Sequence, residues 1–183
     1  MPPPIPVILV AYRPEWPEMA AGYAVKIMTL GPAVAVVHHI GSTAVPGLAA
    51  KPIIDLMPLV TDLAALDRYR ADVEALGYDW HGEFGLPGRR YCTLTDATGT
   101  RVAQFHFFEL GSAEAERHLA FRDYLRAHPD EARAYAAEKR RARDLHPADS
   151  HAYTDEKGAW IRDREAKALA WVASYSSATN ASI

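Results

Sequence analysis

The sequence has few cysteines, little net charge and no long apolar run. Its 183 residues include one cysteine, Cys92, so no disulfide can form within the chain, and this favours a reducing compartment. A formal net charge of -3 gives no overall positive field to attract nucleic acid or an anionic membrane surface. No apolar run approaches the ~20 residues of a membrane-spanning helix, and the opening MPPPIPVILV lacks the basic start of a secretory signal. We expect a soluble cytoplasmic protein without a membrane or nucleic-acid partner, and its oligomeric state stays open.

Internal repeats and low-complexity segments are also absent from the sequence. Hydrophobic residues make up 49% and charged residues 23%, as in an ordinary globular protein. At this length we expect one domain. Its character changes at Gly111, from mixed strands and helices to helices alone. The prediction is an α+β fold, with a sheet half over about residues 1–111 and a helical half over about 112–175 that covers one face of the sheet.

Apolar periodicity and turn residues predict the individual elements. Strands are expected at residues 5–12, 33–40, 53–60, 89–95 and 102–110. Helices are expected at 16–30, 62–76, 113–127, 129–145 and 155–175, with a polar tail to Ile183. In the last strand, alternation places Gln104, His106 and Phe108 on one face, and Phe105, Phe107 and Glu109 on the other.

The stretch from His39 to Asp55 carries most of the chemical information. A strand that ends in Gly41-Ser42 lets backbone amides approach a phosphate closely, because glycine has no Cβ and serine is small. Asp55 is the only charge in the next apolar strand, and a buried carboxylate needs a partner. Such a carboxylate could hold a divalent cation beside the phosphates, which is the arrangement used for nucleotidyl transfer.

Three motifs in this stretch resemble a known family. HIGST at residues 39–43, VPGL at 45–48 and KPIID at 51–55 closely resemble the signature of the GrpB (UPF0157-type) family of the nucleotidyltransferase superfamily, and FRDYLR at 121–126 extends the match. The resemblance implies a nucleotidyltransferase-like mixed sheet flanked by helices, with the helical C-terminal half packed on it. It implies a transferase that binds a nucleoside triphosphate or a related phosphorylated small molecule. Relatives fused to dephospho-coenzyme A kinase imply an association with nucleotide or coenzyme metabolism.

The motifs and the spacing of the cations together give a set of candidate site residues. Asp55 would hold Mg²⁺, and His106 with Gln104 would orient the acceptor or a water molecule. The ligand would be bound by Gly41, Ser42 and Thr43 at its phosphates, and by Lys51, Arg90 and Arg122 at its remaining charge.

Two positions depart from the pattern that the resemblance implies. Met57 stands where a second carboxylate is expected, on the same strand face as Asp55, and a thioether is a poor ligand for a hard cation. One metal ion or none is therefore expected. Gln104 stands where the family has the first histidine of a His-x-His pattern, so zinc, which would need His39, His106 and Asp55 together, is the less favoured metal.

Other interpretations stay open. The cleft could belong to a binding module that has lost its chemistry, or could serve other small-metabolite chemistry with His39, Asp55 and His106 in acid, base or metal roles. Arg122 could instead form a salt bridge within the helical half. The basic residues 139–143 are interpreted as a solvated helix end, which the helix dipole favours.

Overall fold

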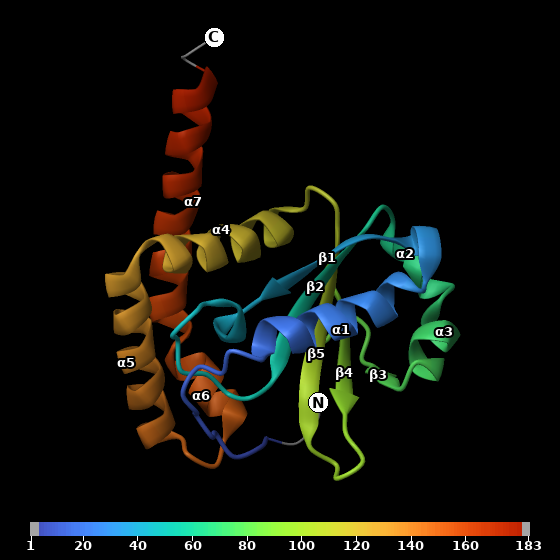
Figure 1. Ribbon diagram of the computed structural model, residues 1–183, viewed down its shortest axis with the longest axis horizontal. Coiled ribbons are helices and arrows are strands. Elements are labelled where there is room, and N and C mark those ends of the chain that lie inside the picture. The colour runs from blue at the N-terminus through green and yellow to red at the C-terminus, as the bar shows by residue number, and fades with distance from the viewer. Residues whose placement is uncertain (1–3, 181–183) are drawn as a thin grey trace.

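A five-stranded mixed sheet forms the centre of the computed structural model, which describes residues 4–180 apart from the side chains of Pro32 and 176–180 (Figure 1). The strands lie in the order β1-β2-β5-β4-β3. β2 and β5 pair in parallel, and the other neighbours are antiparallel. This confirms the predicted α+β class with a mixed sheet. The strands are β1 (Val34–Ile40), β2 (Ile54–Val60), β3 (Tyr78–Trp80), β4 (Arg90–Thr95) and β5 (Arg101–Glu109).

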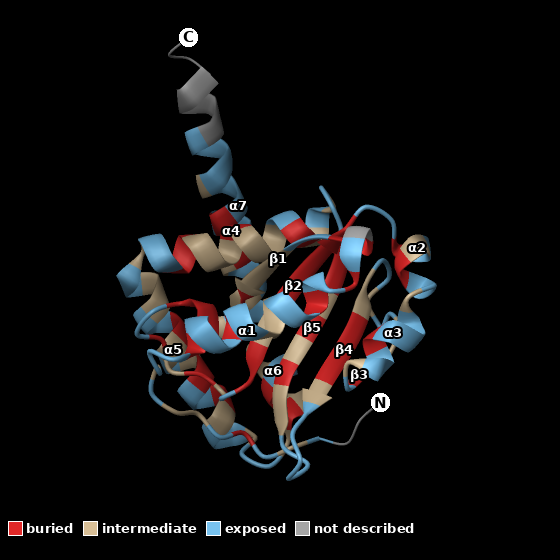
Figure 2. Ribbon diagram, turned by 45° about the vertical axis from the view of Figure 1, so that its right-hand side comes forward, coloured by how far each residue is buried: buried red, intermediate tan, exposed pale blue. Residues whose placement is uncertain are grey.

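The larger core lies on one face of the sheet, beneath the helices α1 (Trp16–Met28), α2 (Leu63–Asp67) and α3 (Arg70–Ala75). Alternate residues of β2 and β5, such as Leu56 and Phe105, face this side and are fully buried. Trp16 packs among them. Burial of such large apolar side chains contributes most of the driving force for folding. Figure 2 shows the buried residues concentrated along the strands.

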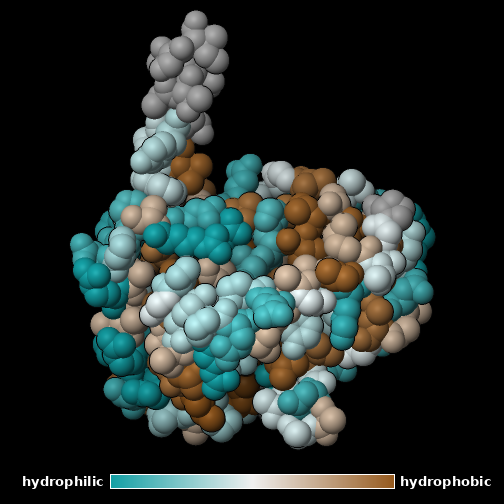
Figure 3. Space-filling view, in the orientation of Figure 1, coloured by the Kyte–Doolittle hydropathy of each residue, from teal (hydrophilic) through white to brown (hydrophobic). Residues whose placement is uncertain are grey.

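The opposite face of the sheet is covered from the helical half. Its helices are α4 (Ala113–Ala127), α5 (Pro129–Leu145), α6 (Ser150–Glu156) and α7 (Gly158–Asn180). Met57 of β2 and Phe108 of β5 pack against Ala115 of α4 in a second apolar cluster. In Figure 1 α7 runs along the helical half and projects beyond it. Figure 3 shows hydrophilic and hydrophobic side chains intermixed on one surface of the molecule.

Several predicted elements differ in the structure. Residues 5–12 form no strand, and only Val10 bridges to Ala50, since Pro4 and Pro6 supply no backbone N–H. The helix expected over 62–76 is split into α2 and α3 at Tyr69. β3 was not predicted, because three residues are too few to show a period.

The last predicted helix is also divided. Lys157 separates α6 from α7, and α6 begins early because the Asp149 carboxylate accepts hydrogen bonds from the backbone N–H groups of His151 and Ala152. α7 continues to Asn180, and the last part of the predicted tail, residues 181–183, lies outside the described residues. Within residues 4–180 no helix has both the length and the apolar character needed to cross a membrane.

Candidate functional site

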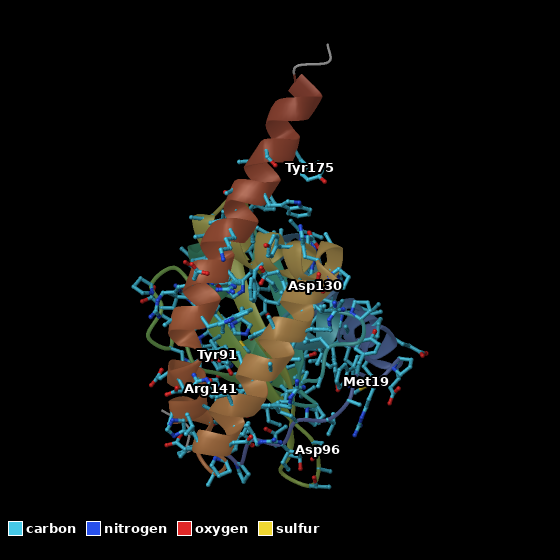
Figure 4. All side chains as sticks on the ribbon, turned by 90° about the vertical axis from the view of Figure 1, so that its left-hand side faces the viewer. Met19, Tyr91, Asp96, Asp130, Arg141 and Tyr175 are labelled. Atoms are coloured by element: carbon cyan, nitrogen blue, oxygen red, sulfur yellow. The ribbon has the colours of Figure 1, made fainter. Side chains whose placement is uncertain are left out.

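A cavity of about 330 Å³ lies between the sheet and the helical half. The sheet contributes Asp55 from β2, and Gln104 and His106 from β5. Side chains from α4, α5, α6 and the start of α7 line the opposite wall. Figure 4 views the molecule from the side of the helical half, where α5 and α7 lie in front of the sheet. The volume is at the lower end of the range for small-molecule sites, so the cavity suits a small ligand.

The floor of the cavity depends on a close approach between Asp55 and Gly41. Ile40 and Asp55 are directly paired between β1 and β2, so the turn that follows Ile40 begins beside the carboxylate. Gly41 has φ +70°, and a Cβ placed on it would stand 2.6 Å from Asp55 Oδ2. Only glycine meets both conditions. The Gly41-Ser42 turn therefore lies directly beside the Asp55 carboxylate.

Hydrogen-bond donors converge on one oxygen of Asp55. Gln104 Nε2 donates to Asp55 Oδ1 at 3.2 Å, and His106 Nε2 lies 3.5 Å from the same oxygen. The register of the sheet explains this, because Asp55 is paired with Gln104 between β2 and β5. The hydroxyl of Tyr91 donates to Gln104 Oε1, which fixes the orientation of the amide.

The proton positions on His106 follow from Arg89. Arg89 Nη1 lies 3.5 Å from His106 Nδ1, and a guanidinium can only donate. Nδ1 is therefore the acceptor, and a neutral ring carries its proton on Nε2, which faces Asp55. Burial lowers the pKa of the Arg89 guanidinium, and the nearby Tyr91 and Glu114 act against that shift. The result is a chain of donors that ends at the Asp55 carboxylate.

Three lysines line the helical side of the cavity: Lys51, Lys139 and Lys157. Lys139, on α5, is only 2% exposed, and its ammonium group donates to the backbone oxygen of Ala49. Lys157 Nζ lies 4.2 Å from the ring centroid of Tyr153, and Lys51 Nζ lies 5.6 Å from the same centroid. Three amines from three separate segments thus meet in one cavity.

Burial changes the acid-base properties of these amines. It lowers the pKa of Lys139 and of Lys157 to about 7, and neighbouring cations add to the effect. Burial also lowers the pKa of Lys51. The negative charge of Asp55 acts in the opposite direction on all three. Lys139 and Lys157 are therefore only partly protonated near pH 7, and Asp55 is the carboxylate that partly compensates the positive charge they carry.

Arg122 has features of both interpretations made from the sequence, namely ligand contact and a salt bridge within the helical half. It lines the cavity, and its Nη1 donates to the backbone oxygen of His39 at 3.1 Å. Its Nε and Nη2 donate to the Asp123 carboxylate at 2.8 and 2.9 Å. The salt bridge and the cavity position are thus both present. Through its hydrogen bond to His39, Arg122 also stabilises the end of β1, which leads into the Gly41 turn.

Most of the predicted site residues line this one cavity. They are Gly41, Ser42, Thr43, Lys51, Asp55, Gln104, His106 and Arg122.

Arg90 and His39 are placed differently. Arg90 donates through Nε and Nη2 to the Asp67 carboxylate at 2.6 and 2.7 Å, which corrects its assignment to the ligand. It is paired with Phe107 of β5, whose side chain packs in the core beneath α1, so Arg90 projects away from the cavity. His39 Nε2 lies 2.9 Å from Thr43 Oγ1, and burial lowers its pKa to about 4, so it is a neutral ring that supports the turn.

The metal expectations can be compared with the donor groups present. Met57 is fully buried in the apolar cluster beneath α4, so position 57 supplies no ligand atom for a hard metal ion. Across residues 4–180 no group of three or more His, Cys, Asp or Glu side chains is arranged to hold a metal ion. Glu165, the other carboxylate of the cavity wall, pairs with Arg117. These residues do not fit a protein-held pair of metal ions or the zinc site of His39, His106 and Asp55.

Sequence reasoning missed several cavity residues. Lys139 was grouped with the solvated basic cluster, but Tyr135, Lys139 and Ala142 follow one another at helical spacing and are the buried residues of α5. That spacing could have separated Lys139 from its exposed neighbours Arg140 and Arg141. Arg89, predicted as the first residue of a strand, lies one residue before β4 and contacts the cavity residue His106, a contact to which no signal in the sequence pointed.

Comparisons with known proteins agree on one family. The family model described as "GrpB protein" matches residues 6–167. UPF0157 protein YqkA of Bacillus subtilis is 37% identical over 166 residues, which cover 90% of this chain and 48% of that relative. The crystal structure of the conserved protein GrpB from Enterococcus faecalis has a TM-score of 0.83 at 36% identity, covering 90% of this chain and 99% of that one.

A relative with a named activity also matches. A dephospho-CoA kinase of Mycolicibacterium paratuberculosis is 32% identical over 192 residues, which cover 91% of this chain and 47% of the kinase. This chain therefore spans about half the length of both this kinase and YqkA.

Proposed function

This chain belongs to the GrpB family, and from that premise we propose that it is a nucleotidyltransferase-like transferase whose cavity binds a nucleoside triphosphate or a related phosphorylated small molecule. The observation that carries the proposal is the position of Asp55. Its carboxylate lies against the Gly41 backbone, receives hydrogen bonds from the sheet, and faces a cavity lined by lysines. A glycine turn beside a carboxylate and several cations is the combination that phosphoryl chemistry uses.

Each group in the cavity has a role in this proposal. The Gly41-Ser42 turn binds phosphate oxygens, and Lys51 with Arg122 neutralises their charge. His106, which carries its proton on Nε2, donates to an oxygen of the acceptor or of a water molecule, and Gln104 holds Asp55 in place. Catalysis then rests on positioning and electrostatic stabilisation rather than on a covalent intermediate.

Magnesium stays a prediction for this site. Among the described residues, Asp55 is the one carboxylate that lines the cavity without an arginine partner. The side chains present therefore do not complete a coordination shell for Mg²⁺. A single Mg²⁺ would require oxygens of the ligand itself as further ligands. When bound, it would add charge neutralisation at the phosphates.

The relatives suggest which molecules to test. Dephospho-CoA kinases that contain a region similar to this chain favour coenzyme A precursors as candidate ligands beside the nucleoside triphosphates. These molecules share the phosphate groups that the cavity is suited to bind.

A binding module without catalysis is the second candidate. Its support is Met57, which is 0% exposed and packs where a nucleotidyltransferase-like site would place a second carboxylate. Such a module would bind the same class of ligand and release it unchanged.

A thermal-shift panel tests the proposal. A ligand present at 100 times its Kd stabilises a protein by about 2.7 kcal/mol, which is a readily measured shift. The panel contains nucleoside triphosphates and coenzyme A precursors, each with and without Mg²⁺. Asp55→Ala is compared with Asp163→Ala, whose carboxylate is exposed on α7 and pairs with Lys167. Turnover that is lost only in Asp55→Ala supports the transferase, and binding without turnover supports the module. A panel without any shift contradicts both.

A further inference from the structure

Within the described part of the chain, the three cavity lysines form no ion pair with a carboxylate. Lys51 comes from the loop before β2, Lys139 from α5, and Lys157 from the junction of α6 and α7. None of the ion pairs found among residues 4–180 joins one of these lysines to a carboxylate within 4.0 Å. We call them the lysine triad.

The carboxylates near the triad are already engaged. Glu165, which lines the cavity, pairs with Arg117. Asp55 accepts a hydrogen bond from Gln104 and lies 3.5 Å from His106 Nε2. It carries a single negative charge, whereas three amines line the same cavity. The chain therefore supplies too little negative charge in the cavity to balance the three amines.

Burying an unpaired ammonium group is costly, and a folded protein keeps such a group where something else compensates it. Around Lys139 the charged groups are Lys157, Arg140 and Asp55, and around Lys157 they are Lys51 and Asp55. Two cations stand against one carboxylate around Lys139, and one cation stands against one carboxylate around Lys157. An anion with two charges would return both amines to their protonated form and would remove this cost.

We propose that the lysine triad is a binding site for a doubly charged terminal phosphate group, and that it binds this group without a divalent cation. The inference deepens the proposed function and rests on it, because it names the part of the phosphorylated ligand that the helical half holds. A phosphate monoester presents three oxygens and two negative charges, which match three amines. A carboxylate has one charge and two oxygens, and the phosphodiester of a nucleic acid has one charge, so neither matches the triad as well.

The role of Asp55 distinguishes phosphate binding by the triad from phosphate binding through a metal ion. In a metal-mediated site Asp55 helps to hold the phosphate, because it holds the cation. In the triad Asp55 opposes the phosphate, because the two are negative charges in one cavity. Replacing the Asp55 carboxylate by an amide of similar shape therefore changes the affinity in opposite directions in the two cases.

Pyrophosphate is a suitable probe, and its Kd is measured by calorimetry on the full chain in the presence of EDTA. Lys139→Met and Lys157→Met should each weaken binding about tenfold or more, and Lys157→Arg, which keeps the charge, should recover most of the loss. Lys167→Met is the matched control, since Lys167 is half exposed on α7 and pairs with Asp163. Asp55→Asn should tighten binding about fivefold. Melting curves without ligand show that each variant is folded.

Each outcome decides between the alternatives. Three results would overturn the inference: pyrophosphate binds only when Mg²⁺ is added, its Kd is unchanged by both lysine substitutions, or its binding is weakened by Asp55→Asn. If that happens while nucleotides still stabilise the wild-type protein, the proposed function stands and the triad does not. If pyrophosphate behaves as expected but no nucleotide or coenzyme A precursor is turned over, the triad stands and the transferase does not.

Discussion

The carboxylate of Asp55 lies against the backbone of Gly41 so closely that the smallest side chain at position 41 would collide with it, with a Cβ 2.6 Å from Oδ2. This approach joins the turn after β1 to the one charged residue of β2. The candidate site is built around it.

Gly41→Ala tests that approach. Alanine must adopt φ +70° and must displace the carboxylate, so we expect a loss of unfolding free energy of about 2 to 4 kcal/mol in urea denaturation. Gly47→Ala is the control, because Gly47 has φ +76° but no atom within 4 Å of its Cβ position. Its cost should be about 1 to 2 kcal/mol, the backbone penalty alone. Equal losses for the two variants would show that the Asp55 contact is unimportant.

Met57→Asp tests whether position 57 could serve as a second metal ligand. The side chain is 0% exposed and lies among Ile40, Leu59 and Phe108, so an unpaired carboxylate there should cost about 3 kcal/mol or more. Met57→Leu, which keeps the apolar volume, should cost less than about 1.5 kcal/mol. A Met57→Asp protein that keeps full stability and gains affinity for Mg²⁺ would contradict the assignment of Met57 to the core.

Nitrogen NMR of the histidine rings tests the role of Arg89. In the neutral ring of His106 we expect a bare Nδ1 and a protonated Nε2, because Arg89 donates to Nδ1. Arg89→Leu should produce a mixture of the two tautomers, whereas Arg133→Leu, an exposed arginine that pairs with Asp130, should leave the spectrum of His106 unchanged. A neutral His106 ring with its proton on Nδ1 in the wild-type protein would contradict the donor chain described above.

The dependence of stability on pH tests the burial of the lysines. Folding lowers the pKa of Lys139 and of Lys157 from 10.5 to about 7, so between these values the unfolded chain binds more protons than the folded one. The free energy of unfolding therefore rises with pH through this window, and the gain is lost as pH falls toward 7. Urea denaturation at pH 7 and pH 9 should show this gain in the wild-type protein and a smaller one in a Lys139→Met, Lys157→Met double variant. Equal gains in both would mean that these amines titrate normally.

The parts of the fold that depend on short-range periodicity could be predicted from the sequence. Alternation in residues 104–109 predicted that Gln104 and His106 share one face and Phe105 and Phe107 the other. In the structure the first pair lines the cavity and the second lies in the larger core. It also placed Asp55 and Met57 on one face of β2, where the structure has them.

The remaining features depend on pairing across the sheet and on tertiary packing. Arg90 could be recognised as a residue on the wrong face only once its partner Phe107 was known. Lys139 could be separated from the solvated cluster only by treating α5 as a helix with a buried face. The break at Lys157, directly before Gly158, was not predicted, because the apolar pattern was interpreted as one continuous helix.

Phosphorus NMR titration tests the central claim, that this cavity binds phosphorylated molecules, most directly. Nucleoside triphosphates, dephospho-coenzyme A and pyrophosphate are titrated in separate samples, because several of their phosphorus resonances overlap. We expect the resonances of at least one of them to broaden and shift when the wild-type protein is added, and to be restored when Lys157→Met replaces it. Resonances that remain unchanged at protein concentrations equal to those of the ligands would contradict the account.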